Sequence, residues 1–218
     1  MPADLHTHSE ASSDSSIPIL DRIELASERG IDTVGITDHM AVHGWLDGRT
    51  QHHDGVTVVS GVEANCTVAD GRVDILGLFV DPDTLRARVG ATTREGVTVE
   101  DGADLDPGTI IEWIHGAGGV AVVAHPSRYD RALGKLMNTL VEAGIDGIET
   151  YYPYEKSPPG TPNTPRVEIE RIADTHELVR SGGNDCHGPE YVTGTLIGII
   201  ELPDCHVDEL QQQSQTYR

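Results

Sequence analysis

The stretch "PGTIIEWIHGAGGVAVVAHP", residues 107–126, contains the unit from which the fold is built. Its proline suits the first turn of a helix, apolar residues follow at helical spacing, and glycines end the pattern. The next five residues, "VAVVA" at 120–124, form the apolar run that is typical of a strand buried on both faces. A helix that leads directly into a buried strand is the repeating unit of a parallel α/β sheet.

Helix-then-strand order recurs on both sides of this stretch. The expected helices lie in 16–30, 132–144 and 166–183, and the strand-like segments after them are 32–37, 145–152 and 184–188. This repetition predicts a mostly parallel α/β sheet, either open or closed into a barrel. The 218 residues fit one domain, 1–218.

Two parts of the chain depart from this alternation. The strand-like runs 55–68 and 72–80 are separated by "ADG", in which Asp70-Gly71 is a tight-turn signal, so they predict a hairpin or neighbouring strands. Between residues 81 and 106 the pattern weakens into an acidic, Gly-rich segment. This composition predicts an irregular excursion on the surface.

Acidic residues dominate the charged composition. The chain has 36 Asp and Glu against 15 Lys and Arg, which gives a formal net charge of -21. Repulsion of this size destabilises a compact state unless salt screens it, and the Debye length falls to about 3 Å at 1 M salt. We therefore expect an acidic, halophilic protein of a high-salt cytoplasm.

The same composition argues against several kinds of partner. Lys and Arg are too sparse to release counterions from a nucleic-acid backbone, so we expect no extended nucleic-acid surface. No apolar run approaches the ~20 residues of a membrane span, and the N-terminus lacks signal-peptide features, which predicts a cytoplasmic protein without membrane contact.

Three cysteines without CxxC spacing predict no disulfide framework. The oligomeric state is left open by the sequence.

Histidines and carboxylates gather at the ends of the expected strands. His6 and His8 are two residues apart, so their side chains lie on the same face of an extended segment. Strand-like runs are also followed or ended by Asp38, His39, His125, Asp185 and His187, and two further runs contain Glu63 and Asp74. Barrels of this class place their sites at the carboxyl ends of strands. Several carboxylates in one place raise one another's pKa and destabilise the fold unless cations lie among them, so we expect divalent metal ions.

The order of these motifs resembles a known family. The segments that carry the resemblance are "DLHTHSEASSD" (4–14), "GITDH" (35–39), "GVEANC" (61–66), "DILGLFVD" (74–81), "GGVAVVAHPSRY" (118–129), "GIDGIETYYPY" (144–154) and "SGGNDCHG" (181–188). In this order they resemble the PHP (polymerase and histidinol phosphatase) superfamily of metal-dependent phosphoesterases. The resemblance implies a distorted seven-stranded (β/α) barrel with up to three metal ions in a cleft. Compared with many such proteins, the lid region at 81–106 is shortened.

The resemblance also implies how metal ligands are divided. The first ion would be bound by His6, His8, Glu63 and Asp185, the second by Glu63, Asp74 and His125, and the third by Asp14, His39 and His187. Asp74 stands where the family usually has histidine, and a carboxylate is a harder ligand that favours Mn²⁺ or Mg²⁺ over Zn²⁺. We expect Mn²⁺ or Zn²⁺ first, with Mg²⁺ and Fe²⁺ as alternatives.

The activity implied by the resemblance is hydrolysis of a small phosphate ester, such as a nucleotide, an oligonucleotide end or a sugar phosphate, by metal-activated hydroxide. Asp185, His187 and His39 are the candidate catalytic residues, and the choice between the two histidines as the acid is open. Arg128 is the candidate phosphate-binding residue, because a guanidinium matches a phosphate bidentately. A surface ion pair with Asp130 is the alternative role for Arg128.

The sequence offers two alternatives to phosphoester hydrolysis. The chain could be a non-catalytic metal-binding PHP domain with a structural or regulatory role, although a decayed site should have lost several ligands. Hydrolysis of C–N bonds is disfavoured, because neither Lys135 nor Lys156 ends a strand. Five further histidines lack supporting partners in the pattern and are expected to be solvated: His43, His52, His53, His115 and His206.

Overall fold

The structure, a computed structural model, alternates strands and helices. It describes residues 2–69, 71–92, 105–129, 132–153, 164–188, 200 and 202–217, with the backbone alone for 89–92. The strands are β1 (Ala3–Thr7), β2 (Thr33–Ile36), β3 (Thr50–His53), β4 (Val56–Val68), β5 (Gly71–Leu78), β6 (Val120–Val123), β7 (Gly147–Tyr151) and β8 (Val179–Gly182). The helices are α1 (Ile19–Glu28), α2 (Pro82–Thr92), α3 (Pro107–Gly116), α4 (Leu133–Glu142), α5 (Arg166–Thr175) and α6 (Asp204–Ser214), with 3₁₀ turns η2 (Pro126–Arg128) and η4 (Gln215–Tyr217).

Seven of the strands form one path through the sheet, in the order β1-β2-β4-β5-β6-β7-β8. The pairs β1–β2, β2–β4, β6–β7 and β7–β8 are parallel, whereas β4–β5 and β5–β6 are antiparallel. In three of the parallel pairs, β1–β2, β6–β7 and β7–β8, one helix connects the strands and returns the chain to the same end of the sheet. The predicted α/β class is confirmed.

Two details differ from a closed barrel of seven strands. An eighth strand, β3, pairs antiparallel with β4 beside the main path. Its sequence, "TQHH", lacks the alternation of apolar residues that predicts a strand. In the described residues, β1 and β8 share no ladder, but Thr7 and Cys186, which lies just beyond β8, form a single parallel bridge. The two edges of the sheet therefore meet at the carboxyl end of β1.

Strand β4 is long enough to serve both halves of the sheet. Its first part pairs with β2 and its second part with β5. Between these parts, a Cβ added to Gly61 would lie 2.7 Å from Thr37 Cγ2 and 2.8 Å from the Gly77 carbonyl oxygen, so only glycine fits the bend. The predicted hairpin of β4 and β5 is confirmed, with Val68 paired to Gly71, and Asp70 lies outside the described residues.

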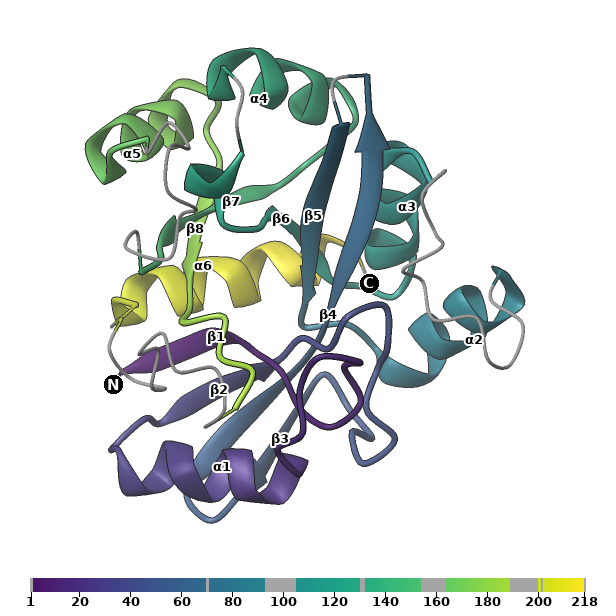
Figure 1. The fold of residues 1–218 in the computed structure, drawn as a ribbon, viewed down its shortest axis with the longest axis vertical. Helices are drawn as coiled ribbons and strands as arrows, with labels where there is room; N and C mark the ends of the chain where they lie inside the picture. The colour runs from purple at the N-terminus through teal and green to yellow at the C-terminus, as the bar shows by residue number, and fades with distance from the viewer. Residues whose placement is uncertain are drawn as a thin grey trace.

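Helices cover the sheet on both sides. Helix α1 packs on β2 and β4, α3 packs on β4, β5 and β6, and α5 packs on β7. Figure 1 shows α1 at the bottom of the view and α4 and α5 at the top, with the strands between them. Among the described residues, no helix combines the length and the apolar character that crossing a membrane requires. This packing leaves the carboxyl ends of the strands as the place where polar side chains collect.

The segment 81–106 is more regular than the sequence predicts. Its first part is helix α2, so the expected irregular excursion is wrong there. The Asp81 carboxylate accepts the backbone N–H of Thr84 at 2.8 Å, and Pro82 begins the helix, where a missing N–H leaves no bond unmade. Residues 93–104 lie outside the described part of the chain.

Candidate metal centre

The first strand brings two imidazoles to one carboxylate. His6 lies in β1 and His8 just after it, and both side chains are fully buried. His6 Nε2 and His8 Nε2 each lie 3.2 Å from Glu63 Oε2. Asp185, beyond β8, places Oδ1 3.6 Å from His6 Nε2 and 3.3 Å from His8 Nε2. The bridge between β1 and the chain after β8 therefore aligns donors that are far apart in the sequence.

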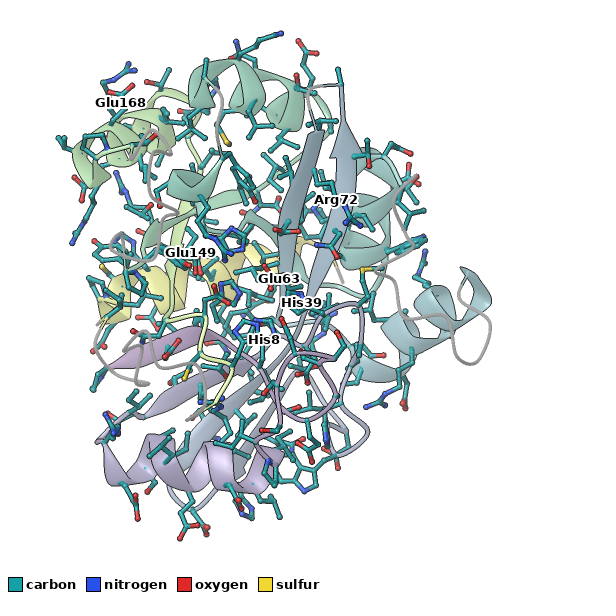
Figure 2. All side chains as sticks on the ribbon, viewed as in Figure 1. His8, His39, Glu63, Arg72, Glu149 and Glu168 are labelled. Atoms are coloured by element: carbon teal, nitrogen blue, oxygen red, sulfur yellow. The ribbon has the colours of Figure 1, made fainter. Side chains whose placement is uncertain are left out.

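Glu63, in β4, lies at the centre of the cluster. Its Oε2 atom is also 3.2 Å from His39 Nδ1, and its Oε1 atom is 2.8 Å from His125 Nε2. Figure 2 shows His8, His39, Glu63 and Glu149 close together near the middle of the molecule. Burial raises the pKa of Glu63, but the neighbouring imidazoles more than offset this effect and hold its pKa well below the ordinary value. The carboxylate is therefore ionised and faces two sets of donors.

On one side of Glu63 lie Asp74 and His125. Asp74 Oδ2 is 3.7 Å from His125 Nε2. The Asn65 side chain donates to the other oxygen of Asp74, and the backbone N–H of Asp74 donates to the Tyr129 hydroxyl at 2.9 Å. Burial and the charge of Glu63 raise the pKa of Asp74. Two carboxylates forced together in this way call for a cation between them.

On the other side, Asp14, His39 and His187 form a triangle. Asp14 Oδ2 lies 3.4 Å from His39 Nε2 and 3.2 Å from His187 Nε2, and the two Nε2 atoms are 3.4 Å apart. The Asp14 side chain is 37% exposed, which makes this the open side of the cluster. Burial lowers the pKa of His39, but the charges of Asp14 and Glu63 outweigh burial and raise it to about 9.

All nine candidate ligands thus lie in one region. Three groups have donor atoms within 4.8 Å of one another: His6, His8, Glu63 and Asp185; Glu63, Asp74 and His125; and His8, His39 and His187. The third group includes His8 where the sequence predicts Asp14, although Asp14 contacts both other members. Ligands at about 2.0–2.2 Å from an ion lie about 3.0–3.5 Å from each other, and most of the separations above fall near this range.

The hydrogen bonds of the Nδ1 atoms of His6 and His187 show why their Nε2 atoms, which face the cluster, suit a metal ion. His6 Nδ1 donates to Glu149 Oε1 at 3.0 Å, and His187 Nδ1 donates to the Asp185 carbonyl at 3.0 Å, because both oxygens can only accept. In their neutral form these two rings present Nε2 lone pairs to carboxylate oxygens. Lone pairs that face each other in a buried site repel unless a proton or a metal ion lies between them. The donor set consequently fits divalent ions.

Arg128, in η2, contacts the cluster through Asp185. Its Nη1 atom donates to Asp185 Oδ2 at 3.0 Å, and the Tyr152 hydroxyl donates to the same oxygen at 3.0 Å. Asp185 thus directs one oxygen to the histidines and the other to a guanidinium. The Arg128 side chain remains 40% exposed, and its alternative partner Asp130 lies outside the described residues.

Two polar residues that support this cluster, Glu149 and Ser12, are missing from the sequence-based candidates. Glu149, in β7, is fully buried and accepts the His125 backbone N–H at 2.6 Å in addition to the His6 ring. Ser12 accepts from His8 Nδ1 at 3.0 Å and donates to the buried Asp38 at 2.9 Å. A charged residue inside the apolar strand "GIETY" is a signal that could have identified Glu149.

The expectation of solvated side chains is wrong for three of the five histidines, His43, His115 and His206. The His43 side chain is 16% exposed, its Nδ1 accepts the Trp45 N–H at 3.0 Å, and its Nε2 lies 3.4 Å from Glu10 Oε1. His115 Nε2 lies 2.8 Å from Asp146 Oδ2, and the imidazole stacks on Tyr217 with 3.8 Å between ring centroids. His206 is buried and lies between Tyr151 and Glu209. Helix α6 and turn η4 contribute to the contacts of His115 and His206, and the sequence pattern does not show where that helix packs.

Comparison with known proteins gives consistent relatives. Residues 4–152 match the family profile described as the PHP domain. The protein MJ1587 of Methanocaldococcus jannaschii is 29% identical over 168 residues, which cover 72% of this chain and 84% of that protein. The "Probable phosphatase YcdX" of Escherichia coli is 31% identical over 134 residues, or 57% of this chain and 53% of YcdX. The chain therefore spans about half the length of YcdX.

Solved structures share the fold. One of them is a protein from Bifidobacterium adolescentis whose structure carries the name of a metal-dependent phosphoesterase. Its fold matches this chain with a TM-score of 0.72 at 22% identity, and the match covers 98% of each chain. PfuEndoQ, a lesion-specific endonuclease from Pyrococcus furiosus, has a TM-score of 0.51 at 22% identity, covering 68% of this chain and 41% of its own. With the profile matching most of the 218 residues and the same fold in these neighbours, the chain belongs to the PHP domain family.

Proposed function

We propose that this chain is a metal-dependent phosphoesterase that hydrolyses a small phosphate ester. The observation that carries the proposal is Glu63, whose two oxygens face two separate sets of donors. A carboxylate shared in this way suits two ions held side by side, as in many phosphatases and nucleases. The names of YcdX and of the Bifidobacterium protein point to the same class of reaction.

The ligands proposed for the ions are the ones that converge on Glu63. His6, His8, Glu63 and Asp185 would hold one ion, Glu63, Asp74 and His125 a second, and Asp14, His39 and His187 a third. Divalent ions bound there would polarise phosphoryl oxygens, lower the pKa of water and stabilise the leaving oxygen. Mn²⁺ and Zn²⁺ suit the mixed imidazole and carboxylate set, and Mg²⁺ and Fe²⁺ are the alternatives.

The residues around these ligands have separate tasks in the proposal. Asp185 orients the histidines with Oδ1 and the Arg128 guanidinium with Oδ2. The remaining N–H groups of Arg128 would bind a phosphate oxygen. His39 and His187 line the more exposed side with Asp14, and each would act there either as a ligand or as the proton donor to the leaving group. A histidine whose Nε2 atom binds metal cannot be that donor.

The proposed substrate is a nucleotide, an oligonucleotide end or a sugar phosphate. A net charge of -21 repels a long polyanion, so attraction to phosphate must come from the ions and Arg128. PfuEndoQ, which shares the fold, is an endonuclease, and for this reason oligonucleotides belong in the substrate panel. The absence of an extended nucleic-acid surface stays a prediction.

The experiment compares metal-free and reconstituted protein. Chelator-treated protein is assayed with p-nitrophenyl phosphate, bis-p-nitrophenyl phosphate, mononucleotides, short oligonucleotides and sugar phosphates, with and without Mn²⁺, Zn²⁺ or Mg²⁺. We expect turnover only after metal is added. Glu63→Gln should lower kcat/KM at least about 10³-fold and reduce the number of bound ions, because it removes the charge that both sets of donors share.

The control is the same chemical change at the edge of the molecule. Glu168 lies on α5, away from the labelled cluster in Figure 2, and pairs with Arg171 at the surface. Glu168→Gln should leave both activity and metal content unchanged. Metal bound in defined stoichiometry without turnover on any phosphoester would instead support a non-catalytic, structural or regulatory metal-binding domain.

A further inference from the structure

Helix α1 carries a fully buried arginine behind the metal centre. Arg22 is 0% exposed and lies on the same helix face as the apolar residues Ile19, Ile23 and Ala26. An aliphatic residue at this position would continue the apolar stripe. Burial of a guanidinium is unfavourable unless its donors are matched, so its hydrogen bonds identify what it does.

The guanidinium joins two chain segments. Arg22 Nε and Nη2 donate to the His8 carbonyl at 3.1 and 3.0 Å, and Nη2 also donates to the Cys186 carbonyl at 2.9 Å. Nη1 donates to Cys186 Sγ at 3.0 Å. His8 is a proposed ligand, and Cys186 lies between the proposed ligands Asp185 and His187. A single side chain therefore bonds the backbone on both sides of the first group of donors.

The same two segments are otherwise joined by few backbone bonds. The His8 N–H donates to the Cys186 carbonyl at 3.0 Å, and the Asp185 N–H donates to the His6 carbonyl at 2.8 Å. No ladder links β1 and β8 in the described residues. The two edges meet through the bridge of Thr7 and Cys186, and Asn184 donates its backbone N–H and its side-chain amide to Asp4 of β1. The separation of His8 from Asp185 thus depends on a junction to which Arg22, on α1, adds hydrogen bonds to His8 and Cys186.

We propose that Arg22 is a positioning residue that sets the distance between the ligands on β1 and those beyond β8, and so controls metal affinity. This inference rests on the proposed function. The planar fork of arginine fixes several donors relative to one another, which lysine cannot do. Outer partners of metal ligands typically change metal affinity 10–100-fold when they are lost.

The test uses two substitutions at this position and a matched core control. Arg22→Met keeps the length and removes every donor, and Arg22→Lys keeps the charge but not the fork. Ile23→Ala, on the same face of α1, removes packing from a hydrophobic cluster whose members lie outside both segments. For each purified full-length protein, the Mn²⁺ and Co²⁺ dissociation constants are measured by chelator competition, together with the Co²⁺ absorption spectrum, thermal stability, kcat and KM.

We expect Arg22→Met to weaken metal binding about 10–100-fold and to alter the Co²⁺ spectrum, and Arg22→Lys to show a smaller loss. Ile23→Ala should lower thermal stability and leave the dissociation constant and the spectrum as in the wild type. If Arg22→Met does not fold, Arg22→Lys decides the question. An Arg22 variant that loses stability but keeps wild-type affinity and spectrum overturns the inference.

These outcomes separate this inference from the proposed function. Wild-type protein that binds metal but hydrolyses no phosphoester overturns the function alone, because the dissociation constants still report on Arg22. Wild-type protein that binds no metal overturns both. Activity that depends on metal, combined with equal affinities in all variants, overturns the role of Arg22 alone.

Discussion

Glu149 Oε1 lies 3.0 Å from His6 Nδ1, on the edge of the imidazole opposite to the nitrogen that faces Glu63. The second oxygen of Glu149 accepts the backbone N–H of His125 at 2.6 Å. One buried carboxylate on β7 therefore fixes a ring on β1 and the backbone just after β6. Burial lowers the pKa of His6, but Glu149, Glu63 and Asp185 outweigh burial and raise it well above the ordinary value.

Glu149→Gln should weaken metal binding about 10–100-fold, as expected for an outer partner of His6, a proposed metal ligand. The amide has only one acceptor oxygen and cannot satisfy both the His6 ring and the His125 N–H. Chelator competition measures the change. Glu142→Gln, on the exposed surface of α4, is the matched control, and equal affinity in the two variants would contradict the role given to Glu149.

Arg128→Lys should raise KM for a phosphoester about 10-fold or more, with a smaller change in kcat. An ammonium cannot bind Asp185 and a phosphate oxygen with the fixed fork of a guanidinium. Steady-state kinetics and metal analysis check this, and metal content should stay the same. A fall in bound metal with unchanged KM would assign Arg128 to the support of Asp185 instead.

Asp74→His should shift metal preference toward Zn²⁺, because it replaces a hard oxygen donor by an imidazole next to His125. The ratio of Zn²⁺ to Mn²⁺ dissociation constants measures the shift. Asp74→Asn separates charge from donor type, since it removes the negative charge and keeps an oxygen. A ratio that is the same in all three proteins would show that Asp74 does not select the ion.

Asp146→Asn should destabilise the fold by about 1–3 kcal/mol at neutral pH, because buried donors lose a carboxylate. Asp146 accepts from His115 and the Ala121 N–H through Oδ2, and from Tyr217 and Gln213 through Oδ1. Burial raises the pKa of Asp146, but these hydrogen bonds outweigh burial and lower it below the ordinary carboxyl value.

The pH dependence follows from the direction of that shift. A lowered pKa in the folded state gives stabilisation that is complete above the unfolded pKa of about 3.9 and is lost as the pH falls through the folded value. Urea unfolding from pH 7 to pH 3 should show the difference between wild type and Asp146→Asn shrinking below about pH 4. Asp208→Asn, an exposed change on α6, controls for net charge. A difference that grows on acidification would contradict a lowered pKa of Asp146 in the folded state.

The melting temperature should rise with KCl from about 0.1 M to 2 M, because screening relieves the repulsion of a net charge of -21. Differential scanning calorimetry of one preparation across the series tests this. Sucrose at matched osmolality separates screening from preferential exclusion. A melting temperature that is highest in dilute buffer would count against adaptation to a high-salt cytoplasm.

Strand periodicity and strand ends predicted much of the site. The two-residue spacing of His6 and His8 places both imidazoles on one side of the chain at β1. His125 follows β6, as expected, and meets Glu63, which lies inside β4. These inferences need only the direction in which side chains alternate. The β4–β5 hairpin was predictable for the same reason, since its turn residues lie between two strand-like runs.

Contacts that depend on how helices and loops pack were not predictable in this way. Arg22 occupies the buried stripe of α1, but a helical pattern does not tell which backbone carbonyls lie opposite. Asp14 comes from a loop, and its approach to His39 is set by bonds such as Ser12 to Asp38. Helix α2 begins at Pro82 through the cap from Asp81, a local signal that the acidic composition of the segment obscured.

The junction of the two sheet edges sets the order of events during synthesis. His6 leaves the ribosome early, but Asp185, whose backbone N–H bonds the His6 carbonyl, follows roughly 9–36 s later at translation rates of about 5–20 residues per second. Before that time, His6, His8 and Glu63 can meet one another but not the Asp185 carboxylate. The first group of donors is therefore complete only after the segment beyond β8 pairs with β1.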